Sequence, residues 1–307
     1  MRDAFISELT ALAREDSSVF LVVGDLGFSV IEEFANEFPD RFLNAGVAEQ
    51  TMIGVASGLA SVGFSVFVYS IGNFPTMRCI EQIRNDVCYH KRSVTVVSVG
   101  AGFSYGYLGY THHAIEDIAV MRALPNMTVY SPSDPVEVRA ATRLAVEAKA
   151  PSYLRLAKNG EPTLHPDGEI PDVTKHQLLA PGTDLAILST GSITSVALEA
   201  RDRLAGEGIS AAVISVPRIK PLDPSVFEAV AGAKAILTLE EHSIVGGFGS
   251  AVLEAASRSY VRTPIYTLGA LESEVGKHIG SQAYIRTKNQ IDVDAVCRTA
   301  HEFLATL

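Results

Sequence analysis

The residues best suited to chemistry lie in segment 44–60, where a single acid starts a helical run of small residues. Glu49 falls in the first turn of this run, and no further charged residue occurs until Arg78. Three glycines remove side-chain bulk from the run, so another backbone or a flat ring could approach it closely: Gly46, Gly54 and Gly58. The pattern predicts a helix that is buried on most sides and presents one carboxyl group.

The position of Glu49 allows two interpretations. An acid in a first turn complements the helix dipole, and Asn44 could cap such a helix. Alternatively, a carboxyl that is buried by its surroundings can hold a proton near neutral pH, which suits it to acid–base chemistry. Position alone leaves both interpretations open.

Two further segments follow predicted strands, and α/β sheets bind their ligands at the carboxyl ends of strands. Asp25 and Ser29 lie in Gly-Asp-Leu-Gly-Phe-Ser, which is also an ordinary turn sequence. The loop 100–113 is rich in aromatic residues and glycine, a composition more typical of function than of structure alone. It ends in His112-His113, but an adjacent histidine pair without a third ligand is weak evidence for a metal site.

Short apolar runs alternate with helical periodicity along the chain, and this alternation predicts an α/β fold with mostly parallel sheets covered by helices. We expect two domains, at 1–160 and 184–307, joined by a proline- and glycine-rich linker at 161–183. The predicted strands are 19–23, 65–69, 94–99, 127–130, 152–156, 185–188, 211–216 and 235–239. The predicted helices are 3–14, 76–89, 116–122, 134–148, 193–206, 224–231, 247–258 and 292–305.

Composition excludes several classes of protein. The formal net charge of −10 argues against nucleic-acid binding, which needs clustered Lys and Arg. No apolar run reaches the roughly 18 residues that would span a membrane, and the N-terminus does not read as a signal peptide. The three cysteines show no metal-binding or disulfide spacing, so we expect reduced thiols in a cytoplasmic protein.

The sequence Asn-Ala-Gly-Val-Ala-Glu-Gln at 44–50 resembles the signature of the pyrimidine-binding domain of transketolases and 1-deoxyxylulose-5-phosphate synthases. In that family the glutamate hydrogen-bonds N1′ of the aminopyrimidine of thiamine diphosphate and promotes removal of the thiazolium C2 proton. The resemblance therefore implies a catalytic, cofactor-binding role for Glu49. It also implies that Asp25 lies near the aminopyrimidine and that Phe74 stacks on it; from the residues alone, Phe74 could equally belong to the core.

The resemblance extends to the residues that contact the substrate. Ser29 matches the family's phosphate-contacting serine, and Lys158 stands in place of a phosphate-binding arginine, although a lysine is by default a surface residue. The end of loop 100–113 is similar to Gly-Pro-Thr-His-Gln, which makes His112 the histidine that reaches the substrate. Leu108 and Tyr110 depart from the family, which has an acid and a proline there. Because that acid contacts a donor hydroxyl, we expect a substrate other than the common pentose phosphates.

One family motif is missing from the chain. The family holds the cofactor diphosphate and a divalent metal with Gly-Asp-Gly and a later Asn, and this chain has no Gly-Asp-Gly. The chain therefore resembles the C-terminal subunit of a split transketolase. The resemblance assigns no metal ligand to this chain and implies a partner N-terminal subunit of about 270 residues that holds Mg²⁺, in an α2β2 heterotetramer.

The resemblance implies transfer of a two-carbon ketol unit from a ketose to an aldose, with thiamine diphosphate as cofactor. One alternative is the equivalent subunit of a 2-oxo-acid dehydrogenase or decarboxylase, and another is a non-catalytic assembly subunit. A nicotinamide-dependent oxidoreductase is disfavoured, because the glycines at 246–249 do not have the dinucleotide-binding spacing.

Overall fold

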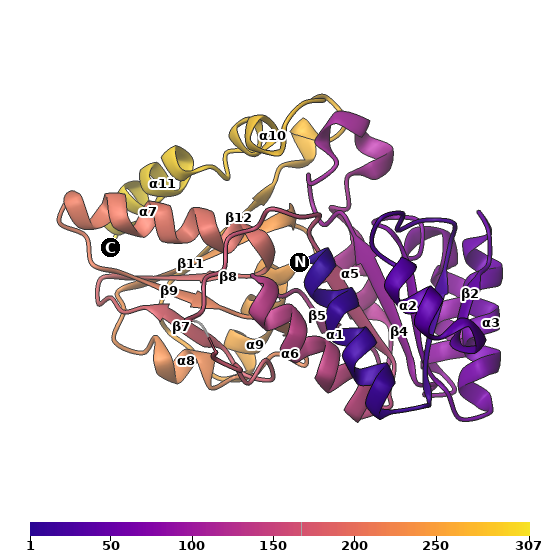
Figure 1. Ribbon diagram of the computed structural model, residues 1–307. Helices are drawn as coiled ribbons and strands as arrows, with labels where there is room; N and C mark the ends of the chain where they lie inside the picture. The colour runs from indigo at the N-terminus through magenta and orange to yellow at the C-terminus, as the bar shows by residue number, and fades with distance from the viewer. Residues whose placement is uncertain (167) are drawn as a thin grey trace.

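Two β-sheets organise the chain in the computed structural model, which describes residues 1–166 and 168–307 (Figure 1). The strands are β1 Val19–Val23, β2 Phe42–Asn44, β3 Ser65–Ile71, β4 Val94–Val99, β5 Thr128–Tyr130, β6 Ser152–Leu156, β7 Gln177–Ala180, β8 Leu185–Ser189, β9 Ala211–Ser215, β10 Arg218–Lys220, β11 Ala235–Ser243 and β12 Ile265–Ala270. A seven-stranded sheet has the order β10-β5-β6-β4-β3-β1-β2, and a five-stranded sheet has the order β12-β11-β8-β9-β7. All neighbouring strands are parallel except β10 with β5 and β7 with β9.

Helices connect and cover these strands. The α-helices are α1 Arg2–Glu15, α2 Glu32–Glu37, α3 Glu49–Ser61, α4 Ile80–Gln82, α5 Asp117–Ala123, α6 Pro135–Ala148, α7 Thr194–Gly206, α8 Val226–Ala229, α9 Phe248–Arg258, α10 Gln282–Lys288 and α11 Val293–Ala305. Shorter turns are η1 Pro39–Arg41, η2 Met77–Cys79, η4 Gly106–Leu108, η5 Tyr110–His112, η6 Gly191–Ile193 and η7 Glu272–Glu274, and η3 Ile83–Cys88 is π-helical. The predicted two-sheet α/β fold is confirmed.

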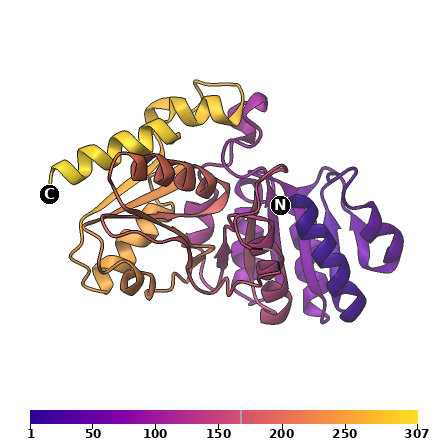
Figure 2. The ribbon, with the colours of Figure 1, turned by 60° about the vertical axis from the view of Figure 1, so that its left-hand side comes forward.

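Both faces of the seven-stranded sheet are buried, as the continuous apolar run of β1 predicts. Phe20 and Val22 point into a core with α3, η3 and α5, whereas Leu21 points into a core with α1, α2 and α6 on the opposite face. The first of these cores continues beneath the five-stranded sheet to α9, and α7 and α11 cover that sheet's other face. Figures 1 and 2 show the two sheets lying side by side.

Three features differ from the sequence expectations. The helix predicted at 76–89 is divided into a 3-10 turn (η2), a short α-turn (α4) and the π-helical η3. The segment expected to be a linker contains β7, which pairs with β9. Strand β10 lies beyond that linker in sequence, yet it pairs with β5 in the first sheet. The domain boundaries therefore stay predictions.

None of the helices described by the structure has the length and apolar character needed to cross a membrane.

Candidate active site

Glu49 is the first residue of α3 and lies at the carboxyl ends of β1 and β3. Its side chain is only 2% exposed, and Arg78 Nη1 donates a hydrogen bond to Oε2 at 2.8 Å. On the strand side, a Cβ placed at Gly24 would lie 3.7 Å from Glu49 Cγ and 3.6 Å from Ser70 Oγ. Ser70 Oγ is itself buried without a hydrogen-bond partner. Glu49 is thus buried near a hydroxyl group that lacks a partner.

The rest of α3 is more open than its sequence suggested. Met52, Ile53 and Ala56 are fully buried, but Gly54 and Gly58 are exposed, and a Cβ at either glycine would meet no atom within 4 Å. The expectation that the helix is buried on most sides is therefore wrong for this chain by itself. The residues of this stretch are therefore uncharged even though part of the helix is exposed, and they are not enclosed by a core.

Arg78 links Glu49 to the predicted stacking residue. Its guanidinium carbon lies 4.9 Å from the centroid of the Phe74 ring, a cation–π geometry. The Phe74 ring in turn meets the His112 ring edge-on at 5.3 Å between centroids. Arg78 was missed as a site residue, although it is the first charged residue after Glu49 and that signal was visible in the sequence.

Tyr105 continues the series from His112 to Lys158. The Tyr105 ring lies 6.4 Å from the His112 ring, and Lys158 Nζ lies 5.4 Å from the centroid of Tyr105. His112 is partly buried, with Nδ1 3.0 Å from Thr111 Oγ1, and Lys158 is exposed. The structure therefore brings Glu49, Phe74, His112 and Lys158 into one unbroken series of contacts. Tyr105 was expected only as one of the aromatic residues of loop 100–113, not as a link between His112 and Lys158.

Asp25 and Asn44 tie the turn after β1 to the start of the Glu49 segment. The Asp25 amide donates to Asn44 Oδ1 at 3.0 Å, and Asn44 Nδ2 donates to Asp25 Oδ1 at 3.0 Å. Asn44 also accepts a hydrogen bond from the amide of Gly46 at 2.9 Å. The suggestion that Asn44 caps the helix is wrong, because Ala48 holds the N-cap position without a side-chain bond.

Ser29 is the one predicted residue whose recorded contact stays within its own turn. Its amide donates to Glu32 Oε1 at 2.6 Å, its φ is +66°, and its side chain is exposed. A role in binding phosphate stays a prediction for Ser29.

The two adjacent histidines have different environments. His113 is buried, with Nε2 3.3 Å from Gly106 O and its ring edge-on to Phe103, and burial lowers its pKa. His112 instead faces the aromatic series described above. Across the described residues, no group of three or more His, Cys, Asp or Glu side chains is arranged to hold a metal ion.

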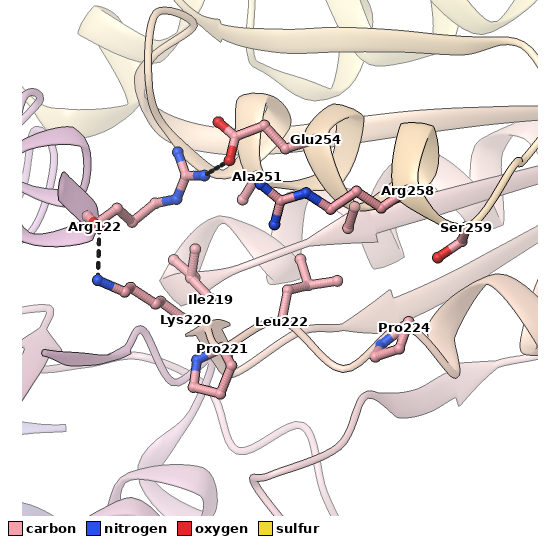
Figure 3. Close-up of a pocket in the computed structure, with 11 residues that line it drawn as sticks. Arg122, Ile219, Lys220, Pro221, Leu222, Pro224, Ala251, Glu254, Arg258 and Ser259 are labelled. Atoms are coloured by element: carbon pink, nitrogen blue, oxygen red, sulfur yellow. Dashed lines mark hydrogen bonds and ion pairs between the residues drawn. The ribbon is translucent and has the colours of Figure 1, made fainter. Parts of the chain in front are cut away.

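A separate cavity of about 460 Å³ lies where α9 faces the β10 turn, and no predicted site residue lines it (Figure 3). Arg122 Nη1 donates to the carbonyls of Gly246 and Gly247, and its Nη2 donates to Glu254. Lys220 Nζ donates to the carbonyl of Arg122 at 2.9 Å. The cavity lies at the junction between the two sheets, and two of its three cations, Arg122 and Lys220, pair with protein oxygens.

The fold places the buried Glu49 at the carboxyl ends of parallel strands, where α/β proteins bind their ligands. Residues 1–161 match the family model described as "Transketolase, pyrimidine binding domain", and residues 174–291 match "Transketolase, C-terminal domain". The chain belongs to the transketolase family.

Relatives of similar length include subunits of divided enzymes. A subunit of the apulose-4-phosphate transketolase from Phocaeicola vulgatus is 34% identical, and the match covers 99% of this chain and 97% of the relative. "6-deoxy-6-sulfo-D-fructose transketolase subunit SqwH" from a Clostridium species is 33% identical, with coverage of 98% and 94%.

A longer relative and a solved structure agree with this assignment. The 1-deoxy-D-xylulose-5-phosphate synthase of Thermomicrobium roseum is 35% identical, and the match covers 99% of this chain and 49% of the synthase. A solved structure described as "Split gene transketolase, inactive beta4 tetramer" superimposes with a TM-score of 0.88 at 34% identity, covering 99% of this chain and 97% of the other.

Proposed function

We propose that this chain is the C-terminal, pyrimidine-binding subunit of a split transketolase. The enzyme transfers a two-carbon ketol unit from a ketose donor to an aldose acceptor, with thiamine diphosphate as cofactor. The observation that carries the proposal is the contact series from the buried Glu49 through Arg78 and Phe74 to His112, on a chain that aligns end to end with split-transketolase subunits.

The residues present fit the aminopyrimidine part of the cofactor. An aromatic face and a carboxylate suit a flat heterocycle with a hydrogen-bonding nitrogen, and Phe74 and Glu49 provide these groups, both in contact with Arg78. Ser70 Oγ, buried and unpartnered, is an additional hydrogen-bonding group near Glu49. When bound, thiamine diphosphate supplies the carbon that carries the two-carbon unit between sugars.

Glu49 shares a proton with the ring nitrogen in this proposal, and its burial keeps water from competing for that contact. Because Arg78 already donates to Oε2, the ring nitrogen contacts Oε1 or shares Oε2 with Arg78. The Arg78 side chain is 50% exposed, so it can move without disturbing the core. Asp25, fixed by Asn44, directly follows Gly24, which lies next to Glu49 at the end of β1.

His112, Lys158 and Ser29 form the substrate side of the proposal. His112 contacts the reacting sugar, and the two others provide a cation and a hydroxyl for an anionic group. Leu108 and Tyr110 are exposed beside His112, and neither replaces the carboxylate expected in the family. A leucine side chain cannot hydrogen-bond a hydroxyl of the donor sugar, so the site does not select for that hydroxyl. We therefore infer a substrate other than xylulose 5-phosphate and ribose 5-phosphate. Relatives named for apulose 4-phosphate and 6-deoxy-6-sulfo-D-fructose support this inference.

A partner subunit completes the proposed enzyme. The described residues offer no cluster of metal ligands, so the cofactor diphosphate and Mg²⁺ are assigned to an N-terminal subunit of about 270 residues. We infer an α2β2 heterotetramer. The three cysteines are free and buried, in keeping with a cytoplasmic location.

The test is reconstitution. This chain is mixed with the N-terminal transketolase subunit of the same organism, Mg²⁺ and thiamine diphosphate, and ketol transfer and cofactor binding are measured for the mixture and for each chain alone. Turnover by the mixture only is the expected result. Activity of this chain alone would contradict the split-site proposal, and a mixture that binds no thiamine diphosphate would favour a non-catalytic assembly subunit.

The same mixture tests specificity. Turnover of xylulose 5-phosphate with ribose 5-phosphate at about 10⁴ M⁻¹s⁻¹ or above would refute the specificity inference and leave ketol transfer standing.

A further inference from the structure

We propose that the C-terminal half of the chain sets the position of His112, with Glu241 as the positioning residue. This inference rests on the proposed function, in which His112 contacts the sugar. Glu241 lies in β11, 129 residues beyond His112 in sequence (241 − 112), and its carboxylate reaches back to the base of the loop that carries the histidine.

The loop 103–113 leaves the first sheet through a narrow stem. The Gly102 amide donates to Ala114 O at 2.9 Å, and the Ala114 amide donates to Gly102 O at 3.0 Å, so two hydrogen bonds close the stem. Beyond the stem the loop contains only the short turns η4 and η5. Both ribbon views show this segment rising from the first sheet to meet the segment before α10 (Figures 1 and 2). Within the loop, His113 Nε2 lies 3.3 Å from Gly106 O, and from the first half of the chain Asn73 Nδ2 donates to His113 O at 2.8 Å. The base of the loop at Phe103 is held from the other half of the chain.

Glu241 holds the first residue of the loop. Its Oε1 accepts a hydrogen bond from the Phe103 amide at 2.6 Å, and the residue is 3% exposed. A Cβ at Gly102 would lie 2.5 Å from Glu241 Cγ, so the carboxylate occupies space that any side chain at Gly102 would fill. The backbone at Gly102 also has φ +60°, which favours glycine.

The carboxylate of Glu241 is itself fixed by α10. Gln282 Nε2 lies 2.8 Å from Oε1 and 3.1 Å from Oε2, and Arg286 Nε donates to Oε2 at 2.7 Å. Rotation of Glu241 away from Phe103 would leave a buried charge imperfectly paired, which is costly. Glu241 therefore holds the loop stem in place, because its contacts with α10 keep the carboxylate from moving with the loop.

Two further residues tie the loop down: Gly280 in the C-terminal half of the chain, and Arg155 in β6 of the first sheet. The Gly280 amide donates to Gly106 O at 3.3 Å, and a Cβ at Gly106 would collide with Gly280 O. Arg155 Nη2 donates to Ala114 O at 2.7 Å and to the carbonyl of Glu241 at 3.0 Å, which joins the end of the loop to β11. Both ends of the loop and its midpoint are thereby tied to the C-terminal half.

The His112 side chain by contrast makes soft contacts: edge-on approaches to Phe74 and Tyr105 and one hydrogen bond to its neighbour Thr111. Its position then depends on the backbone that carries it. A displacement of about 1 Å of a group that contacts the reacting substrate can cost about 100-fold in rate.

The first experiment uses this chain alone and needs no activity. Hydrogen–deuterium exchange is measured for Glu241→Ala, Glu241→Gln and Gln282→Ala, with Glu302→Gln on α11 as a matched exposed control. We expect faster exchange in peptides covering 103–113 for Glu241→Ala and Gln282→Ala, a smaller increase for Glu241→Gln, and wild-type exchange for the control. Gln282→Ala carries the test if Glu241→Ala fails to fold. Wild-type protection of the loop in the folded variants overturns the proposal.

The second experiment uses the reconstituted enzyme and a double-mutant cycle with His112→Ala. We expect Glu241→Ala to lower kcat and raise the donor KM, by about 10- to 100-fold in kcat/KM, with thiamine diphosphate affinity unchanged. In the His112→Ala background the same change should cost less than about 3-fold, because the positioned group is gone. Full additivity of the two losses overturns the proposal. If the wild-type mixture shows no cofactor-dependent turnover, the proposed function fails, whereas the exchange experiment still decides whether Glu241 holds the loop.

Discussion

The glycines of α3 and those of loop 100–113 lie in opposite environments. A Cβ at Gly100 or Gly106 would collide with Tyr105 or with the Gly280 carbonyl, whereas a Cβ at Gly54 or Gly58 would meet nothing within 4 Å. The loop glycines are needed by contacts that this chain makes itself. The α3 glycines are needed by nothing in this chain, so their role, if they have one, depends on a surface outside it.

This contrast separates the loop that the chain packs by itself from the surface that it leaves uncovered. The substrate loop is built and held within the chain, by Glu241 and the segment before α10. The surface beside Glu49 is open, and the proposed N-terminal subunit provides the natural cover for it. Four substitutions test the contrast, two on each side.

The largest effect is expected on the open side, at Glu49. Glu49→Gln removes the acid–base function of the carboxyl, so activity of the reconstituted enzyme should fall by about 100- to 10,000-fold while fold and partner binding persist. Turnover at saturating cofactor, circular dichroism and subunit association are measured, with Glu147→Gln on exposed α6 as the control. Retention of most activity, or simple unfolding, would support the helix-dipole interpretation instead.

On the packed side, His242 should make stability depend on pH. Burial lowers its pKa to about 4, and its Nε2 accepts a hydrogen bond from the Ala119 amide while Nδ1 lies 2.8 Å from Ser243 O, as a neutral ring requires. The unfolded chain takes up this proton near pH 6.5 and the folded chain only near pH 4. Stability is therefore lost as pH falls between these values, by on the order of 3 kcal/mol.

The measurement is urea unfolding at several pH values for the wild type and His242→Gln. The variant is needed because burial raises the pKa of the neighbouring Glu240 to about 7. This shift increases stability as the pH falls, so it partly offsets the loss due to His242 over an overlapping pH range. The wild type should lose more stability than the variant between pH 6.5 and pH 4. Parallel curves would show that His242 is not held neutral.

Gly106→Ala tests the packed side directly. The added methyl group meets the backbone carbonyl of Gly280, which cannot rotate away, so the free energy of unfolding should fall by about 1–3 kcal/mol. Gly232→Ala, at a site with no atom within 4 Å of the new Cβ, should change stability much less. Equal effects in chemical denaturation would mean that the loop is not packed against this segment.

The smallest effect, and one of opposite sign, is expected at Gly58. Alanine is favoured over glycine inside a helix, so Gly58→Ala should stabilise the isolated chain by about 1 kcal/mol. It should also weaken association with the N-terminal subunit, if that subunit packs on α3. Gly206→Ala in α7, equally open, should stabilise without affecting association. Unimpaired association of Gly58→Ala would place the subunit interface elsewhere.

The sequence predicted the fold better than the surroundings of the site. Strands such as Val19–Val23 and Val94–Val99 were predicted at their observed bounds, because continuous apolar runs report directly on burial in a parallel sheet. Strand β10 escaped notice because three residues, Arg218–Lys220, carry too little pattern. The π-helical turn at Ile83–Cys88 depends on packing that no local pattern encodes.

Contacts between distant residues account for what was missed at the site. Glu49, Phe74, His112 and Lys158 were chosen one by one from a resemblance, and the structure places them in one series. Arg78 and Tyr105, which connect them, carry no motif of their own. The hydrogen bond from the Phe103 amide to Glu241 spans 138 residues, so it cannot be seen in either segment alone.

Strand β10 makes the first sheet depend on the C-terminal half of the chain. It covers the outer edge of β5, and without it the first sheet would end in an unpaired strand with free amide and carbonyl groups. Such edges recruit other strands and lead to aggregation. A fragment cut after the predicted linker would keep every residue of the contact series but lose this protection. The half of the chain that carries the contact series therefore depends on β10, and we expect truncation at residue 183 to yield an aggregation-prone protein.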